Sequence, residues 1–314
     1  MPNLKVAAPP APTLLEGLVT DYLASCRARG LAPSTVNQAY AYSLQDVFLP
    51  WCARVGVETV DQLDQRALDR FTSGLLEDGG KRGKPLSKDT VHSYVRAVRQ
   101  FLKWAAKEGE AVKGTPQLPR LTRRVLDVLS REEIERLEEA APTERDKLII
   151  RLLADTGIRV GELCGLRPED IVRSQDRRTF LKVRGKGSKE RLVPLSPPLV
   201  RRLDRLQRGR TAETHSDRLF LALRKSPHGD YPALSTSGVL QLMRGAAERA
   251  GMKKRVHPHL LRHSFATEAL RKGMNPVQLA QVLGHSGLRM IEHVYSHLTA
   301  TDAYDAVIKL LVSE

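Results

Sequence analysis

The chain has 314 residues, of which 51 are lysine or arginine and 36 are aspartate or glutamate, so its formal net charge is +15. At about 150 residues per domain, this length predicts two domains, each able to bury an apolar core without disulfides or metals. The charge favours a polyanionic partner, most often nucleic acid; a merely solubilising surplus is the alternative.

The cysteines and the apolar runs exclude two further classes of protein. Cys26, Cys52 and Cys164 are odd in number and far apart, and none forms a CxxC pair, which argues against a disulfide framework or a cysteine zinc site. No apolar run approaches the ~20 residues of a membrane helix, and no apolar signal core follows the N-terminus. We therefore expect a reduced, cytoplasmic protein with no membrane partner.

The first half of the chain predicts a helical bundle. Residues 1–12 are rich in proline and alanine and are expected to be disordered. Apolar residues at helical spacing predict four helices within residues 13–107, the first domain. Their expected positions run from Thr13 to Cys26, from an N-cap at Ser34 to Val55, over Asp64–Leu76, and from Ser87 onward.

A linker and a second domain follow. Residues 108–127 contain prolines and glycines with little periodicity and are predicted to link the domains. Ser130 and Glu133 form a capping box that opens the second domain, residues 128–314. Its helical pattern is interrupted by three expected strands, at Ile171-Val172, Phe180–Val183 and Arg191–Val193. The expected fold class is mainly α, with a small antiparallel sheet in the second domain.

The positive charge is concentrated in the second domain. Residues 128–314 carry a net charge of +10, against +3 for residues 1–105 and +2 for residues 106–127. Two basic domains joined by a basic hinge suit a clamp around a duplex.

Two short segments of the second domain carry a cation between glycines. Arg159 lies near Gly157 and Gly161 at the start of a predicted helix, where its guanidinium could contact a phosphate; a surface arginine capping a turn is the alternative. Lys186, in the turn before the last strand, could contact a phosphate or protonate a leaving oxygen, or merely solubilise the turn. Because Gly187 follows it, the segment is not a nucleotide-binding phosphate loop.

Histidines and one tyrosine mark the rest of the domain. His259 and Arg262 are three residues apart and can present donors to one anion from a helix face. His259 and His263 have the spacing of zinc ligands, but the glutamate of zinc proteases is missing and no cysteine lies nearby, so we expect no metal. His285, in Leu-Gly-His-Ser, and Tyr295 could by themselves be a cap and a core residue.

The ordered set is more informative than its members. It resembles the tyrosine recombinase (phage integrase) family through the strings TGIRVGELCGL, GKGSKERLVPL, HPHLLRHSFAT and LGHS, which together span the second domain. The first domain resembles, less specifically, the family's four-helix core-binding (SAM-like) module. The matching positions are Arg159, Glu162, Lys186, His259, Arg262, His285 and Tyr295.

The resemblance implies a site-specific recombinase that cleaves and rejoins DNA through a 3′-phosphotyrosyl intermediate, without metal, nucleotide or other cofactor. Tyr295 would be the nucleophile, Lys186 would protonate the 5′ oxygen, and Glu162 would support Arg159. The remaining implied roles are phosphate clamps for Arg159 and Arg262, a hydrogen-bond donor for His285 and an acid–base group for His259.

Three other functions are alternatives to a site-specific recombinase. A type IB topoisomerase uses similar residues without a special site, and a non-catalytic DNA-binding relative would keep only the binding. A histidine-dependent metallohydrolase would require a metal.

The resemblance also implies partners. The expected partners are a duplex recombination site and further protomers, as a homo-tetramer on two sites or a hetero-tetramer with a second recombinase. The segment Thr301–Val312 is expected to dock into a neighbouring protomer, or alternatively to pack in cis. For the first domain, the expected major-groove contacts come from the helix after Ser87, through Lys88, Arg96, Arg99 and Lys103.

The biological role stays open between integration, excision and resolution. The ten-residue step from His285 to Tyr295 is one residue longer than in the Xer branch and resembles integrases of mobile elements. The short segment before the first helix leaves no room for the additional arm-site-binding domain that many such integrases carry, so the overall size is Xer-like.

Overall fold

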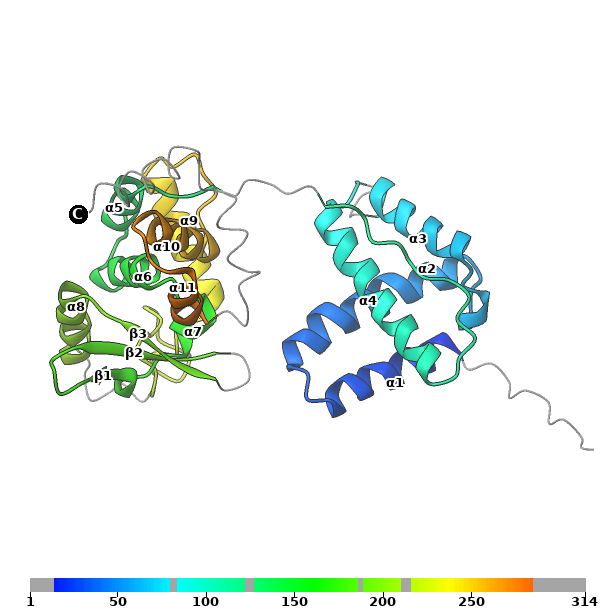
Figure 1. Cartoon of the computed structure of the whole chain (residues 1–314), viewed down its shortest axis with the longest axis horizontal. Helices are drawn as coiled ribbons and strands as arrows, with labels where there is room; N and C mark the ends of the chain where they lie inside the picture. The colour runs from blue at the N-terminus through cyan, green and yellow to red at the C-terminus, as the bar shows by residue number, and fades with distance from the viewer. Residues whose placement is uncertain (1–13, 80–83, 122–126, 186–188, 210–215, 285–314) are drawn as a thin grey trace, which may run out of the picture. The chain divides into compact units, whose positions relative to one another are not determined.

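The computed structural model describes residues 14–79, 84–121, 127–185, 189–209 and 216–284. The chain divides into two compact units, residues 1–123 and 124–314 (Figure 1). The N-terminal segment 1–12, predicted to be disordered, lies outside the described residues. No helix in the described ranges is long and apolar enough to cross a bilayer.

The first unit is helical. Its elements are α1 (Leu15–Ala28), the π-type helix η1 (Thr35–Phe48), α2 (Leu49–Arg54), the 3-10 turn η2 (Val60–Gln62), α3 (Gln65–Glu77) and α4 (Lys88–Lys107). Helix α4 packs against η1, α1 and α3. It buries Val91, Val95, Val98 and Phe101, one every three to four residues, because this spacing places them on one face.

The second helical segment begins before Ser34, so the predicted N-cap there is wrong. Ser34 has helical backbone angles and its side chain makes no capping hydrogen bond. Instead, the carbonyl of Ala32 accepts the backbone N–H groups of Thr35 and Val36. Pro33 therefore occupies the first helical position, where its fixed φ is favourable and its missing N–H costs nothing.

Part of the predicted linker packs on the first unit. Val112 and Leu118 lie against its apolar core, and the Thr115 backbone N–H donates to the Gln65 side chain (3.2 Å). A Cβ atom on Gly114 would lie 2.9 Å from the backbone nitrogen of Gln65, so only glycine fits this close approach. The segment that joins the two units without packing on the first is thus shorter than the predicted linker, residues 108–127.

The second unit combines helices with a small sheet. Its helices are α5 (Arg131–Glu139), α6 (Glu144–Thr156), α7 (Val160–Gly165), the 3-10 turn η3 (Pro168–Asp170), α8 (Pro197–Arg208), α9 (Thr236–Arg249), α10 (Pro258–Arg271) and α11 (Pro276–Leu283). Strands β1 (Ile171–Arg173), β2 (Thr179–Arg184) and β3 (Glu190–Pro194) form an antiparallel sheet in the order β1-β2-β3. The mainly α fold with a small antiparallel sheet is confirmed.

Helix α6 forms the centre of this unit (Figure 1). It packs against α5, α8 and α10, and its Leu148, Ile149, Ile150, Leu152 and Leu153 are all buried. A helix that is buried on several faces has apolar residues at consecutive positions of its sequence, rather than only every three or four residues.

Three sets of hydrogen bonds fix the chain where it enters the second unit. Ser130 and Glu133 form the predicted capping box, each side chain accepting the other residue's backbone N–H. The Leu129 backbone N–H donates to the buried Ser264 hydroxyl of α10 (2.8 Å), and the Lys254 ammonium donates to the Val128 carbonyl (2.8 Å).

Phe101→Ala should selectively destabilise the first unit. Phe101 is fully buried, and replacing such a side chain with alanine costs about 3–5 kcal/mol. Both tryptophans, Trp51 and Trp104, lie in this unit, so the midpoint of urea unfolding followed by tryptophan fluorescence should fall. Leu203→Ala, at a fully buried position of α8, is the control and should leave this midpoint unchanged; an equal shift would show that the units unfold together.

Candidate active site

A sharp turn between α6 and α7 positions Arg159. Gly157 ends α6 in the left-handed conformation (φ 60°, ψ 18°), and Ile158 is fully buried. Arg159 is then extended and directly precedes α7. A Cβ atom on Gly157 would lie 2.5 Å from the Phe265 ring, so both the angle and the space require glycine.

Arg159 is held on two sides. Its Nη1 donates to Glu162 Oε1 (2.9 Å) and its Nη2 donates to the Gly284 carbonyl (3.2 Å). Its backbone N–H donates to Glu162 Oε2 (2.8 Å), which satisfies an end of α7. The side chain remains 37% exposed, so an external anion can reach the guanidinium.

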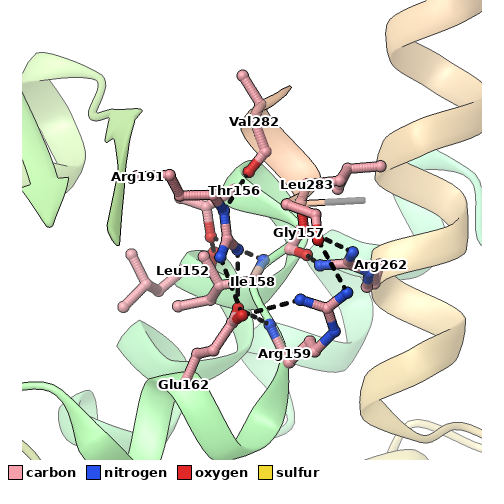
Figure 2. A network of polar contacts seen from close by, with 11 residues as sticks. Leu152, Thr156, Gly157, Ile158, Arg159, Glu162, Arg191, Arg262, Val282 and Leu283 are labelled. Carbon is pink, nitrogen blue, oxygen red and sulfur yellow. Dashed lines mark hydrogen bonds and ion pairs between the residues drawn. The ribbon is translucent and has the colours of Figure 1, made fainter. Parts of the chain in front are cut away.

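Glu162 is the buried centre of the cluster (Figure 2). Its side chain is 6% exposed and also accepts two parallel hydrogen bonds from Arg191 of β3, Nη1 to Oε1 (2.9 Å) and Nη2 to Oε2 (2.8 Å). Burial raises the pKa of Glu162, but the hydrogen bonds from Arg191 and Arg159 together lower it by more. The pKa of Glu162 therefore lies below its ordinary value. The carboxylate therefore stays ionised.

Arg262 approaches from α10. Its Nη1 donates to the Gly157 carbonyl (2.6 Å) and its Nη2 to the Leu283 carbonyl (2.7 Å). The residue is 8% exposed. Burial, and then the nearby Arg159 charge, lower the pKa of Arg262 to about 10. The guanidinium is thus still a cation at neutral pH.

The described cluster has an excess of positive charge. The guanidiniums of Arg159, Arg191 and Arg262 surround the single carboxylate of Glu162, which leaves two positive charges uncompensated among these four side chains. A desolvated excess of this kind favours binding of an anion, and guanidiniums suit the oxygens of a phosphate.

His259 and its neighbours begin α10. His257 caps the helix, its Nδ1 accepting the Leu260 backbone N–H (3.2 Å); burial, then the charges of His259 and Arg255, lower the pKa of His257. His259 is exposed while Arg262, three residues later, is buried. In the described ranges, no three histidine, cysteine or acidic residues are grouped as metal ligands.

Three of the predicted catalytic residues belong to segments that the structure does not describe. Lys186, His285 and Tyr295 lie outside the described residues, as does the segment Thr301–Val312. The chain on either side of Lys186 is described: β2 and β3 flank it, and the Gly185 backbone N–H donates to the Lys189 carbonyl (2.8 Å). Gly284, directly before His285, ends α11 in the left-handed conformation.

Arg191 was not predicted from the sequence. Nothing in the sequence marks it, because its neighbours Leu192 and Val193 are both apolar and do not alternate with polar residues; in the structure Leu192 is 52% exposed whereas Val193 is buried. Arg191 shares the inward face with Val193 because successive side chains of a strand point to opposite sides. An arginine at an inward position requires a buried partner, and Glu162 is that partner.

The predicted DNA-binding residues lie on the other unit. Lys88, Arg96, Arg99 and Lys103 are all exposed on α4. Their spacing of eight, three and four residues places them along one exposed stripe of the helix.

The second unit matches the family model described as the phage integrase family, over residues 127–302. The chain belongs to this family of tyrosine recombinases. A tyrosine recombinase of Pseudothermotoga lettingae is 35% identical over 74% of this chain and 78% of its own length. Another, of Thermosipho africanus, is 30% identical over 93% of this chain and 98% of its own length.

Solved structures have the same fold. A crystal structure of XerA recombinase is 26% identical, with a TM-score of 0.51, over 94% of this chain and 98% of that one. The integrase of transposon Tn1549, solved with transposon right end DNA, is 19% identical with a TM-score of 0.72, over 96% of this chain and all of that one (100%). The matched family region contains all seven predicted catalytic and supporting positions.

Gly157→Ala should destabilise the recombinase's second unit. The added methyl group meets Phe265 and Leu283, and a non-glycine residue at this positive φ costs about 1–3 kcal/mol. Urea unfolding followed by circular dichroism should show the loss. Gly165→Ala, where a Cβ atom has open space and φ is not positive, should be neutral; equal stability of the two variants would contradict the role given to Gly157.

Proposed function

We propose that this tyrosine recombinase cuts and rejoins duplex DNA at a specific site through a 3′-phosphotyrosyl intermediate. The observation that carries the proposal is the cluster of Arg159, Glu162 and Arg262 in the region that matches the family. Phosphodiester transfer builds negative charge on the non-bridging oxygens, so its catalysis depends on electrostatics and positioning. The excess positive charge of the cluster suits that requirement.

The proposed clamp consists of two arginines with different surroundings. Arg262 is buried and fixed by two backbone carbonyls, so it offers a rigid cation. Arg159 is partly exposed, and Glu162 fixes its orientation. Prearranged donors of this kind stabilise developing charge without reorganising during the reaction.

In the proposed reaction the Tyr295 phenol attacks the scissile phosphorus, and His259 takes its proton. The bond from phosphorus to the 5′ oxygen breaks, Lys186 protonates that oxygen, and His285 donates a hydrogen bond to the phosphate. The products are a 3′-phosphotyrosyl link and a free 5′ hydroxyl. Because a phenol, with a pKa around 10, leaves more readily than an alcohol, a 5′ hydroxyl can reverse the step.

Recombination requires two DNA sites, and we propose a tetramer, of this chain alone or with a second recombinase. The relatives named above are called tyrosine recombinases, and the Tn1549 integrase was solved on DNA, which supports duplex DNA as the partner. The segment Thr301–Val312 is proposed to join neighbouring protomers. On the first unit, the exposed stripe of α4 is the proposed DNA-binding face.

A covalent adduct should form through Tyr295. Incubation with a pool of nicked, labelled genomic duplexes in chelator should give adducts that survive denaturation and share one sequence, linked through the 3′ phosphate. Tyr295→Phe should give none because it lacks the attacking oxygen, whereas the control Tyr231→Phe should behave as wild type. Adducts without sequence preference would instead indicate a topoisomerase, and no adduct from the wild-type chain would contradict the proposal.

Reversing two charges on α4 should weaken DNA binding and its salt dependence. The slope of log affinity against log salt is negative. With Arg96→Glu and Arg99→Glu together, its magnitude should decrease by about 0.9 for each phosphate that the protein no longer neutralises. Arg66→Glu with Arg70→Glu, exposed on α3, changes the net charge equally. This control should have a smaller effect; equal effects of the two pairs would mean that only total charge matters.

A further inference from the structure

Arg191 joins three parts of the second unit. From β3, its Nη1 and Nη2 bind both oxygens of Glu162 on α7, and its Nε donates to the Val282 carbonyl of α11 (2.6 Å). The side chain is 12% exposed. A Cβ atom on Gly284 would lie 2.8 Å from Nη1, so the guanidinium also packs against the backbone at the end of α11.

The end of α11 is bound by arginines at successive residues. Arg191 donates to the carbonyl of Val282, Arg262 to that of Leu283, and Arg159 to that of Gly284. The last carbonyls of a helix have no partner within the helix and carry a partial negative charge, which cations stabilise. The two proposed phosphate clamps and Arg191 therefore share one anchoring point (Figure 2).

Removal of Arg191 would change the surroundings of Arg159. Of the hydrogen bonds described above, Glu162 would keep those from Arg159, to Oε1 from the guanidinium and to Oε2 from the backbone N–H. A buried carboxylate that loses a bidentate partner attracts the remaining cation more strongly or becomes protonated. Either change alters the direction in which Arg159 presents its exposed edge.

We propose that Arg191 is a positioning residue for DNA cleavage: through Glu162 and the Val282 carbonyl it orients Arg159 and the end of α11 without touching DNA. The inference rests on the proposed function. A purely structural ion pair between β3 and α7 is the competing explanation, so the test needs a readout that stability alone does not change.

The first test compares Arg191→Met and Arg191→Lys with wild type. The substrate is the duplex recovered from wild-type adducts, and single-turnover cleavage, duplex affinity and thermal unfolding are measured. We expect affinity close to wild type and a loss of cleavage of about 100-fold for Met, the scale of effect expected when a reacting group is misplaced by about 1 Å. Lysine should not restore the rate, because it lacks the planar fork that binds Glu162 and Val282 together.

The second readout separates positioning from folding. In the same duplex, the scissile phosphate is replaced by a neutral methylphosphonate, which has less negative charge for Arg159 to stabilise. The loss caused by Arg191→Met should then shrink to less than tenfold. An equal loss on both substrates would indicate general damage to the fold and overturn the inference.

A double variant tests the inference even if Arg191→Met alone does not fold. Glu162→Gln with Arg191→Met removes the unpaired buried charge, and should cleave less than tenfold more slowly than Glu162→Gln alone, because only the contact of Arg191 with the Val282 carbonyl is then left to lose. A multiplicative loss would overturn the inference. The matched control is Arg173→Met, which breaks an arginine–carboxylate pair with Asp204 (2.6 Å) whose arginine side chain is 55% exposed; it should cleave as wild type.

The experiments distinguish a failure of the proposed function from a failure of the inference about Arg191. If wild type forms no adduct, the proposed function fails and takes the inference with it. If wild type cleaves and Arg191→Met cleaves equally fast, only the inference fails.

Discussion

The arrangement of the second unit depends on how the end of α11 is bound. The carbonyl oxygens of Val282, Leu283 and Gly284 accept from Arg191, Arg262 and Arg159, which come from β3, α10 and the α6–α7 turn. Elements separated by more than 100 residues in the chain thus meet at one helix terminus. The partial negative charge of that terminus compensates part of a concentration of cations that would otherwise repel one another.

This arrangement has an electrostatic cost. One ionised carboxylate, Glu162, neutralises only part of the surrounding charge, and the pKa of Arg262 is lowered by burial and by Arg159. Proteins tolerate such unfavourable local charge mainly at functional sites, where a ligand supplies the missing opposite charge. For a tyrosine recombinase with a net charge of +15, the ligand that we propose is a phosphate of DNA.

Local patterns predicted most of the fold and part of the site. The capping box at Ser130, the three strands and the helical spacing of α4 depend on nearby residues, and all are present. Nearby glycines mark Arg159 and the spacing from His259 marks Arg262, whereas Glu162 follows only from the resemblance to the family. The structure places Arg159, Glu162 and Arg262 together; their roles remain predictions, as do those of Lys186, His259, His285 and Tyr295.

The parts that were missed depend on contacts distant in the sequence. Arg191 looks like a solvated charge until the Glu162 carboxylate, 29 residues away, is placed beside it. The segment around Gly114 looks like an extended linker because its apolar partners lie on α3, about 50 residues earlier. At Ser34 the error was local: a serine that can cap was preferred to a proline that starts the helix equally well.

The way in which the chain enters the second unit has a mechanical consequence. Leu129, close after the linker, is tied through its backbone to Ser264, which lies two residues after Arg262 on α10. A tension applied along the linker is therefore carried into the unit by Val128 to Lys254, and by Leu129 to the helix that carries Arg262. The part of that force that reaches α10 through Ser264 acts within about one helical turn of the Arg262 guanidinium.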